Sequence, residues 1–286
     1  MTDKPIIGVD LGATNVSVGK IISGQITQHS TSNISSGGSA KQVNNEIIQA
    51  ITKVFEPDVV GIGVGVPGLV DVTKGIVYDV LNIPSWKKVH LKDLLQSHFQ
   101  RPVFINNDAN CFAVGEKYFG KGKPYRNLVG VTMGSGLGTG IIINDHLYAG
   151  ANCGAGEFGT MPYKDHICEY YCSGQFFKKV YGVNGEDLLE KAKNGDEEAL
   201  QIFKQFGAHL GDAIMTILFA LDPEAIILGG SVCQSFTFFQ EAMWQKVKTF
   251  PYQHTLDHIV IEASSQPFIA VLGAAALYLD AQPNDL

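Results

Sequence analysis

The chain has 286 residues, of which 45% are hydrophobic and 17% are charged, and this composition is typical of a globular protein. The length favours one large domain or two of medium size, either of which can bury a substantial core. The formal net charge is -7, with only 21 Lys and Arg residues. No basic surface for nucleic acid or anionic lipid is evident, so we expect a small-molecule partner instead.

Neither targeting nor membrane insertion is indicated. The N-terminal residues MTDKPIIGVD enter a strand-like run within a few positions, which leaves no room for a signal or transit peptide. No apolar run approaches the roughly 18 residues of a membrane span. We therefore expect a cytoplasmic protein with reduced cysteines. Cys168 and Cys172 are close in sequence, but they lack the second Cys or His pair of a structural zinc site, which favours free thiols.

A Gly-rich hairpin is predicted at residues 8–26, where an apolar strand leads through a tight turn at Gly12 into a second strand. Glycine lets backbone amides approach a phosphate, and Thr14 and Asn15 add side-chain donors. Asp10 would stand near a magnesium ion that bridges phosphates, with water in between, because magnesium sheds its waters reluctantly. The alternative for Asp10 is a turn-forming role without a ligand.

A candidate catalytic carboxylate follows in residues 104–116, FINNDANCFAVGE. The pattern predicts a buried strand that ends at Asn107 and Asp108 and a helix that begins at Ala109. A carboxylate at a strand end, beside amides able to hold sugar hydroxyls, is placed as a general base should be. Asp108 has an equal chance of being the N-cap of that helix. Both roles are compatible, because phosphoryl transfer depends mainly on positioning, with one base to orient the nucleophile.

A second Gly-rich hairpin at residues 130–148 repeats the first without a gap, so that Thr132 corresponds to Asp10 and Gly134 to Gly12. Glycines alternate along its turn, and the backbone and hydroxyl donors there suit the outer phosphates of a nucleotide. A strand follows this turn where a dinucleotide-binding fingerprint needs a helix, and no Gly-Lys-Ser/Thr follows either turn. These phosphate-binding motifs are therefore excluded.

The duplication continues beyond the hairpins. Each hairpin precedes a helical stretch, Lys41 to Phe55 or Glu197 to Leu221, and then a buried strand that ends in glycine, Val59 to Gly68 or Ala225 to Ser231. This order predicts an α/β protein of two βββαβα domains, residues 1–117 and 118–286, around a cleft with the Gly-rich turns at its floor. The last helix is expected to be able to pack back on the N-terminal domain.

Two more carboxylates stand in short apolar or aromatic surroundings. Glu157 lies in GAGEFG and Glu169 lies in CEYYCSG. Acids in such places favour vicinal hydroxyls as partners, but an isolated glutamate in a loop is usually solvated. Both interpretations stay open for each residue.

Five segments occur in a fixed order: residues 10–15, GVGVPGLVD at 63–71, LNIPSW at 81–86, INNDANCFAVGE at 105–116 and GSGLGTG at 134–140. Together they resemble the ROK family of bacterial glucokinase-like sugar kinases, from about residue 6 to residue 277. The resemblance implies the actin-like ATPase fold with two ribonuclease-H-like domains, ATP and Mg²⁺ as cofactors, a small sugar as substrate and a homodimer as the assembly.

The resemblance also implies roles for particular residues. It makes Asp108 the catalytic base. The implied sugar contacts, Asp108 included, are completed by Gly68, Asn82, Asn107, Glu157 and Glu169. The implied contacts to phosphates and magnesium are Asp10, Gly12, Thr14, Asn15, Thr132 and Gly134. Gly229 and Gly230 would lie beside the adenosine.

Two departures from the family pattern stand close together. The Glu-x-Gly-His motif of the family ends here in Thr160, and the usual cysteine-rich zinc loop has shrunk to residues 161–166. In typical members the missing His both binds zinc and touches the sugar, so the resemblance implies that no zinc site is present. His166 is a candidate substitute contact, and a solvated loop histidine is the alternative. Sugar specificity therefore cannot be transferred from a typical glucokinase.

The predicted function is transfer of the γ-phosphate of ATP to a hexose, most simply to O6 of glucose. Kinase action on N-acetylmannosamine, fructose or allose is the related alternative. A second class comprises the repressors of the family, which carry a helix-turn-helix ahead of the kinase-like region, whereas this acidic chain starts directly in a strand. A third is an actin-like ATPase or a non-catalytic sugar sensor, and retention of Asp108 argues against the sensor.

Overall fold

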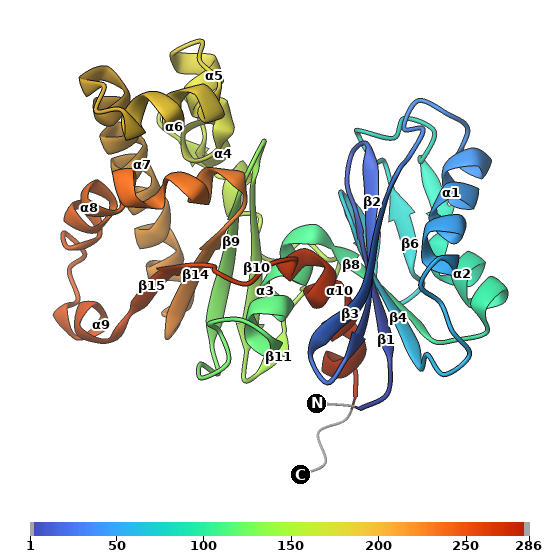
Figure 1. The fold of residues 1–286 in the computed structure, drawn as a ribbon. Helices are drawn as coiled ribbons and strands as arrows, with labels where there is room; N and C mark the ends of the chain where they lie inside the picture. Colours follow the sequence, from blue (N-terminus) through green and yellow to red (C-terminus); the bar gives the residue numbers. More distant parts are fainter. Residues whose placement is uncertain (1–2, 283–286) are drawn as a thin grey trace. The chain divides into compact units, whose positions relative to one another are not determined.

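A computed structural model describes residues 3–282, which pack as two compact units. Unit 1 contains the chain up to Pro124, Gly140–Ala155 and the segment that begins at Ser265, and unit 2 contains Tyr125–Thr139 and Gly156–Ser264. Unit 1 therefore combines blue, green and red segments in Figure 1, because three separate stretches contribute to it. The predicted domains, residues 1–117 and 118–286, are bounded by the two copies of the duplicated sequence and not by these compact units. That division stays a prediction.

The centre of unit 1 is a five-stranded sheet with the order β3-β2-β1-β4-β8. Its strands are β1 (Ile6–Leu11), β2 (Asn15–Ile22), β3 (Gln25–Asn33), β4 (Gly61–Val66) and β8 (Val103–Asn107). β1 is antiparallel to β2 and parallel to β4, which is parallel to β8. Asp10 lies opposite Gly65, and Gly65 lies opposite Asn106. The carboxyl ends of β1, β4 and β8 therefore meet at one edge of the sheet.

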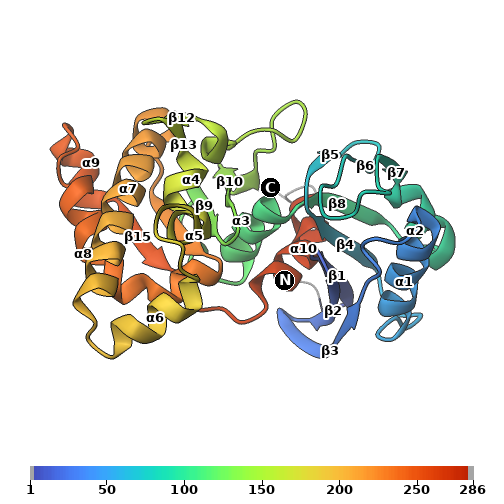
Figure 2. The same cartoon turned by 90° about the horizontal axis from the view of Figure 1, so that it is seen from above.

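Helices cover both faces of this sheet. α1 (Ala40–Thr52) and α2 (Leu91–Phe99) lie on one face, and α3 (Asp108–Tyr118) and α10 (Ile269–Asp280) lie on the other (Figures 1 and 2). The predicted helix at 41–55 is present as α1, and Ser39 caps it by accepting a hydrogen bond from the Gln42 amide. It ends at Thr52, and the amides of residues 54 and 55 both donate to the Ile51 carbonyl in the turn that follows.

Glycines in the sheet let α10 lie directly on its backbone. Gly8 of β1 and Gly63 of β4 are partners in register. A Cβ atom on Gly8 would overlap the carbonyl oxygen of Val271, and one on Gly63 would overlap that of Ala274. No larger residue fits at either position without displacing α10.

A three-stranded sheet of the order β5-β6-β7 completes unit 1. Its strands are β5 (Leu69–Asp71), β6 (Ile76–Tyr78) and β7 (Lys88–His90). The loop from β6 to β7 is anchored by Ile83 and Trp86, whose side chains are fully buried. Asn82 stands exposed on the same loop. The anchor residues therefore hold the loop that presents Asn82 at the surface.

A second five-stranded sheet has the order β11-β10-β9-β14-β15. Its strands are β9 (Leu128–Met133), β10 (Leu137–Ile143), β11 (His146–Leu147), β14 (Ala225–Gly229) and β15 (Val260–Ala263). β9, β14 and β15 are parallel and belong to unit 2. β10 runs from unit 2 into unit 1 after Thr139.

The two hairpins end in the same kind of turn. Ser23 and Gly24 join β2 to β3 with φ values of 49° and 81°. Asn144 and Asp145 join β10 to β11 with φ values of 51° and 73°. Positive φ at both central residues is typical of the type I′ turn that joins twisted antiparallel strands. The predicted repetition of the strand-turn-strand layout is confirmed at both polar turns.

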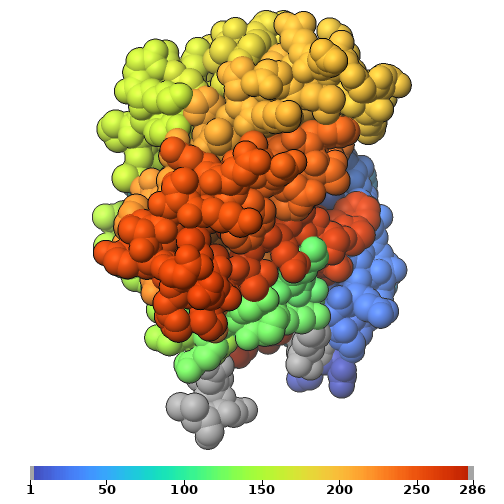
Figure 3. Space-filling model, turned by 90° about the vertical axis from the view of Figure 1, so that its left-hand side faces the viewer, coloured from blue at the N-terminus to red at the C-terminus, as the bar shows by residue number. Residues whose placement is uncertain are grey.

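Unit 2 is mainly helical outside its sheet. Its helices are α4 (Cys168–Cys172), α5 (Gly174–Val180), α6 (Gly185–Lys193), α7 (Glu197–Leu221), α8 (Phe236–Val247) and α9 (Gln253–His258), with the short 3-10 helices η1 (Phe158–Thr160) and η2 (Ser231–Ser235). The remaining strands, β12 (Pro162–Tyr163) and β13 (His166–Ile167), form a small hairpin. α7 has the predicted bounds, and Asp196 caps it. Figure 3 shows α8 and α9, in orange, over one face of this unit.

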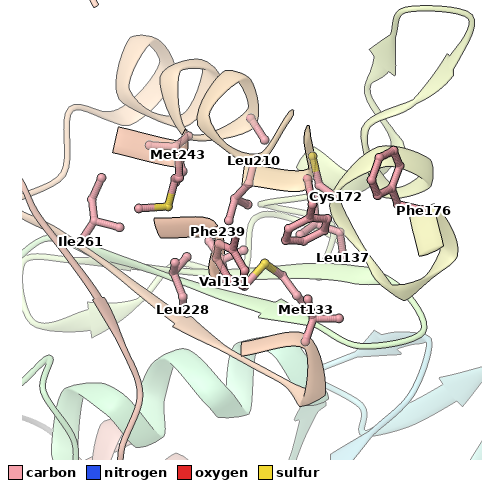
Figure 4. Close-up of a cluster of buried hydrophobic side chains, with 14 of the residues drawn as sticks. Val131, Met133, Leu137, Cys172, Phe176, Leu210, Leu228, Phe239, Met243 and Ile261 are labelled. Carbon is pink, nitrogen blue, oxygen red and sulfur yellow. The ribbon is translucent and has the colours of Figure 1, made fainter. Parts of the chain in front are cut away.

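The core of unit 2 lies between its sheet and α7 and α8. Figure 4 shows Val131 and Leu228 from the strands near Leu210 of α7 and Phe239 and Met243 of α8, and all five side chains are buried. The apolar positions predicted at helical spacing on α7 supply one side of this core. Within residues 3–282, no helix is both long enough and apolar enough to cross a membrane.

Candidate active site

The carboxyl edge of the unit 1 sheet collects several of the predicted residues. Asp10 lies near the end of β1, Gly68 follows β4 with a φ of 97°, and Asn107 and Asp108 stand where β8 passes into α3. Parallel strands bring these positions together although they are far apart in the sequence. Ligands of open α/β sheets bind at this edge.

Asn107, and not Asp108, is the N-cap of α3. The Oδ1 atom of Asn107 accepts a hydrogen bond of 2.7 Å from the backbone amide of Asn110. Asp108 is the first residue of the helix, one position earlier than predicted, and its Oδ1 accepts 2.8 Å from the amide of Ala109. The alternative that Asp108 is the cap is therefore wrong, and its carboxylate also reaches solvent.

Two carboxylates at this edge have raised pKa values. Burial, and after it the negative charge of Asp108, raises the pKa of Asp10 to about 6. Burial also raises the pKa of Asp108, and the hydrogen bond from the Ala109 amide opposes that rise. Asp108 has solvent contact, so the cause is the dense protein around it and not complete enclosure. Both carboxyl groups therefore lose their protons at higher pH than a free aspartate does.

The carboxylate pair fits the way proteins hold magnesium. In the described part of the chain, no three His, Cys, Asp or Glu residues cluster as a metal cage. Magnesium commonly uses one or two carboxylates and completes its shell with waters and substrate phosphates. Asp10 and Asp108 raise the local negative charge, which a divalent cation would offset. Asp10 would hold the ion, as the resemblance implies.

The turn from β1 to β2 exposes two polar side chains. The Gly12 amide donates to the carbonyl of Asn15 at 2.9 Å and so closes the turn. Thr14 and the side chain of Asn15 are exposed. In this conformation these side chains, and not the Gly12 amide, are open to a ligand. Contact of all three residues with phosphate stays a prediction.

A buried polar network beneath Asn107 was missed by sequence reasoning. The Oδ1 atom of Asn106 accepts from the Asn107 amide at 2.9 Å, from Nδ2 of Asn110 at 2.8 Å and from the thiol of Cys153 at 3.1 Å. Cys153 is buried and has a φ of 58°, a region that non-glycine residues rarely adopt. Its thiol joins the loop before unit 2 to the Asn-rich segment. Only the crowding of asparagines in the sequence hinted at such a network.

In unit 2, the predicted nucleotide-binding residues lie close together. Thr132 of β9 pairs in register with Gly229 of β14. Gly230 follows with a φ of 84°, and a Cβ atom there would overlap the backbone of Met133. The carbonyl of Gly134 accepts 2.7 Å from the amide of Gly174 at the start of α5. The glycines therefore allow two strands and a helix to converge on the β9–β10 turn.

A cavity of about 810 Å³ opens beside this turn. Its lining includes Gly134 and Ser135 at the turn and the apolar side chains of Phe177, Leu189 and Val232. Polar residues of α5, of α6 and of the loop between them also line it, among them Lys178, Asn184 and Glu186. Apolar walls with a few polar groups are typical of sites for small organic ligands, and the volume lies within their usual range.

Glu169 and Glu157 differ in their surroundings. The Oε2 atom of Glu169 accepts 3.0 Å from the Leu137 amide, and its Oε1 atom accepts 2.7 Å from Nε2 of Gln175. Glu157 is exposed, and its carbonyl accepts from the amide and the hydroxyl of Thr160. The structure therefore places Glu169 against the predicted phosphate turn and Glu157 at the start of η1. Sugar contact stays a prediction for both.

Aromatic residues hold the shortened loop before α4, residues 161–166, in place. The hydroxyl of Tyr163 donates 2.7 Å to Asp212, and His166 stacks on Tyr170 with ring centroids 4.1 Å apart. Cys168 and Cys172 are buried, and their sulfur atoms are 3.8 Å apart. All five cysteines are free thiols, as predicted. The absence of zinc and the role of His166 stay predictions.

The sequence matches one known protein family over nearly the whole chain. The sequence profile of the ROK family matches residues 6–281. The chain belongs to the ROK family. This membership confirms the predicted family, and with it the actin-like ATPase fold.

Relatives of this ROK chain include both regulators and enzymes. It is 33% identical to a xylose repressor of Bacillus spizizenii over 208 residues, which are 68% of this chain but only 54% of the repressor. It is 28% identical to a glucokinase of Thermotoga maritima over 312 aligned positions, covering 97% of this chain and 98% of that enzyme. The chain thus spans about half the length of that repressor and nearly all of that glucokinase.

Among solved structures, a ROK family glucokinase from Streptomyces griseus in complex with glucose and AMPPNP is 26% identical to this ROK chain. The TM-score is 0.81, and the match covers 96% of this chain and 98% of that one. The similarity supports a sugar kinase in general terms. It does not identify the sugar that would accept the phosphate.

Proposed function

We propose that this protein transfers the γ-phosphate of ATP to a hexose, most simply to O6 of glucose, with Asp108 as the base. The observation that supports the proposal is that Asn107 and Asp108 have different roles at the start of α3. Asn107 caps the helix, so the Asp108 carboxylate is not needed as the cap. It stands at the edge of parallel strands where ligands of such sheets bind.

The chemistry assigned to Asp108 is removal of the proton from the attacking hydroxyl. A base works best when its pKa approaches the working pH, and burial raises the pKa of Asp108 in that direction. The Ala109 amide holds one carboxylate oxygen and so orients the other. Gly68, Asn82 and Asn107 are the proposed sugar contacts in the same unit. Phosphoryl transfer needs little more from the protein than such positioning and charge stabilisation.

The nucleotide is assigned to the unit 2 cavity. Its apolar walls suit a base, and the β9–β10 turn at its end suits phosphates. Magnesium, held by Asp10 with waters and phosphate oxygens, would neutralise charge on the phosphates when bound. The glucokinase of Streptomyces griseus, solved with glucose and AMPPNP, supports this choice of ligands.

A second function is a sugar-binding regulator without turnover. The similarity to the Bacillus spizizenii xylose repressor, at 33% identity, favours it. Within the kinase proposal, N-acetylmannosamine, fructose and allose remain alternative acceptors, because Thr160 stands where the family has a sugar-contacting His. A homodimer is the proposed assembly.

An ADP-release assay with glucose, N-acetylmannosamine, fructose, allose and xylose tests the proposal. We expect at least one hexose to stimulate ATP turnover. Asp108→Asn should reduce turnover by about 10³-fold or more and leave AMPPNP binding within twofold, because the base is lost and the nucleotide site is not. The matched control is Asp93→Asn on the exposed part of α2, which should keep full activity.

One result would contradict the kinase proposal, and another would contradict only the role of Asp108. Sugar binding by calorimetry without any stimulated turnover would favour the regulator instead. Full activity of Asp108→Asn would remove that residue from its role while leaving the kinase activity itself intact.

A further inference from the structure

A carboxylate and a carboxamide grip the β9–β10 turn from one side. Glu169 of α4 accepts from the Leu137 amide at 3.0 Å and from Nε2 of Gln175 at 2.7 Å. The same Nε2 atom donates to the carbonyl of Ser135 at 3.2 Å. Glu169 and Gln175, hereafter the turn clamp, therefore hold both ends of the short segment from Ser135 to Leu137.

The turn is shaped to receive the clamp. A Cβ atom on Gly136 would lie 2.5 Å from Oε2 of Glu169, so the carboxylate packs directly on the backbone of the turn. Gln175 is half-buried and lines the cavity together with Ser135. Its amide nitrogen has two N–H donors, and it donates to the carbonyl of Ser135 and to Oε1 of Glu169. The amide nitrogen therefore links the turn to the Glu169 carboxylate.

We propose that Gln175 is a positioning residue for the outer phosphates of the nucleotide and acts through the turn clamp. The inference rests on the proposed function, because it takes the unit 2 cavity as the nucleotide site. Backbone amides bind phosphates without a reorganisation cost when their directions are set before the ligand arrives. The clamp sets them by fixing the carbonyl of Ser135 and the amide of Leu137.

Calorimetric titration with AMPPNP and with AMP tests the role of Gln175. In Gln175→Leu we expect the Kd of AMPPNP to rise about tenfold, because the carbonyl of Ser135 and the carboxylate of Glu169 both lose their hydrogen bond to the amide group. The Kd of AMP should stay within twofold, because AMP lacks the outer phosphates. The matched control is Gln201→Leu on the exposed face of α7, which should change neither value.

A second variant tests whether the hydrogen bonds of the Gln175 side chain, and not its shape, support AMPPNP binding. Gln175→Lys keeps donors that reach Glu169 and Ser135, so AMPPNP should bind at least as tightly as to the wild type. Equal losses for AMP and AMPPNP in Gln175→Leu would overturn the proposal, because they would mean direct contact with the nucleoside or general damage. AMPPNP binding that is unchanged in Gln175→Leu, or a loss in Gln175→Lys as large as in Gln175→Leu, would overturn it as well.

The titrations need no turnover. A wild-type protein that binds AMPPNP but phosphorylates no sugar would contradict the kinase proposal and leave the clamp to be judged by its own variants.

Discussion

Asn107 and Asp108 are neighbours with different tasks because α3 begins between them. The cap position needs a side chain that turns back to the helix amides, and Asn107 does this with its bond to the Asn110 amide. The carboxylate of the next residue, Asp108, does not cap the helix, and its Oδ1 atom accepts 2.8 Å from the Ala109 amide. A shift of one residue thus decides which side chain is structural and which is available to a substrate.

Asp10 gives a prediction at the same scale. Burial raises its pKa from 3.8 to about 6, so charging it costs stability in the folded state. Well below pH 4 the Asp10 carboxyl is protonated in both the folded and the unfolded state, and the cost is absent. As the pH rises to 6 and beyond, the cost to the folded state grows to about 3 kcal/mol at most. We expect Asp10→Asn to become increasingly more stable than the wild type between pH 4.5 and pH 7 in urea unfolding without magnesium. A stability difference that does not vary with pH would contradict this.

At the scale of elements, α10 illustrates how the end of the chain depends on its beginning. The helix lies on β1 and β4 where Gly8 and Gly63 leave room for its backbone. Most of α10 is buried, so its own sequence shows no polar stripe to indicate which side faces the sheet. The sheet glycines supply that information.

Substitution of one such glycine tests this packing. A Cβ atom on Gly63 would overlap the carbonyl of Ala274, which is backbone and cannot rotate away. We expect Gly63→Ala to lower the free energy of unfolding by about 3 kcal/mol, at the upper end for overpacked cores. Gly37→Ala is the control, because no atom lies within 4 Å of its added Cβ. Urea unfolding should find the control within about 0.5 kcal/mol of the wild type; a similar result for Gly63→Ala would refute the argument.

At the scale of the whole molecule, each unit holds its own share of the predicted residues. Asp10, Asn107 and Asp108 belong to unit 1, and Thr132 and Gly134 belong to unit 2. The proposal therefore assigns the sugar base to one unit and the nucleotide cavity to the other. Ligands that bind only the folded state should stabilise the part of the chain that holds them.

Hydrogen exchange can locate these ligands along the chain. We expect AMPPNP to protect amides in residues 174–189 and 231–235, the two segments that supply most of the cavity lining. At about 100 times its Kd it should also add about 2.7 kcal/mol to the stability of the protein. Glucose alone should protect residues 104–112 of unit 1. Protection of the cavity segments by glucose alone, or their lack of protection by AMPPNP, would contradict the assignment.

The sequence alone determined the repeated hairpins, the bounds of α7 and the family. These depend on local periodicity and turn chemistry, as at Asn144 and Asp145, or on short motifs read in order. Only the tertiary structure decided which asparagine caps α3, that Cys153 bonds to Asn106, and that Glu169 grips the turn at Leu137. The last two contacts join residues 47 and 32 positions apart. No local sequence pattern encodes contacts between residues so far apart in the chain, because these contacts follow from how the strands and helices pack.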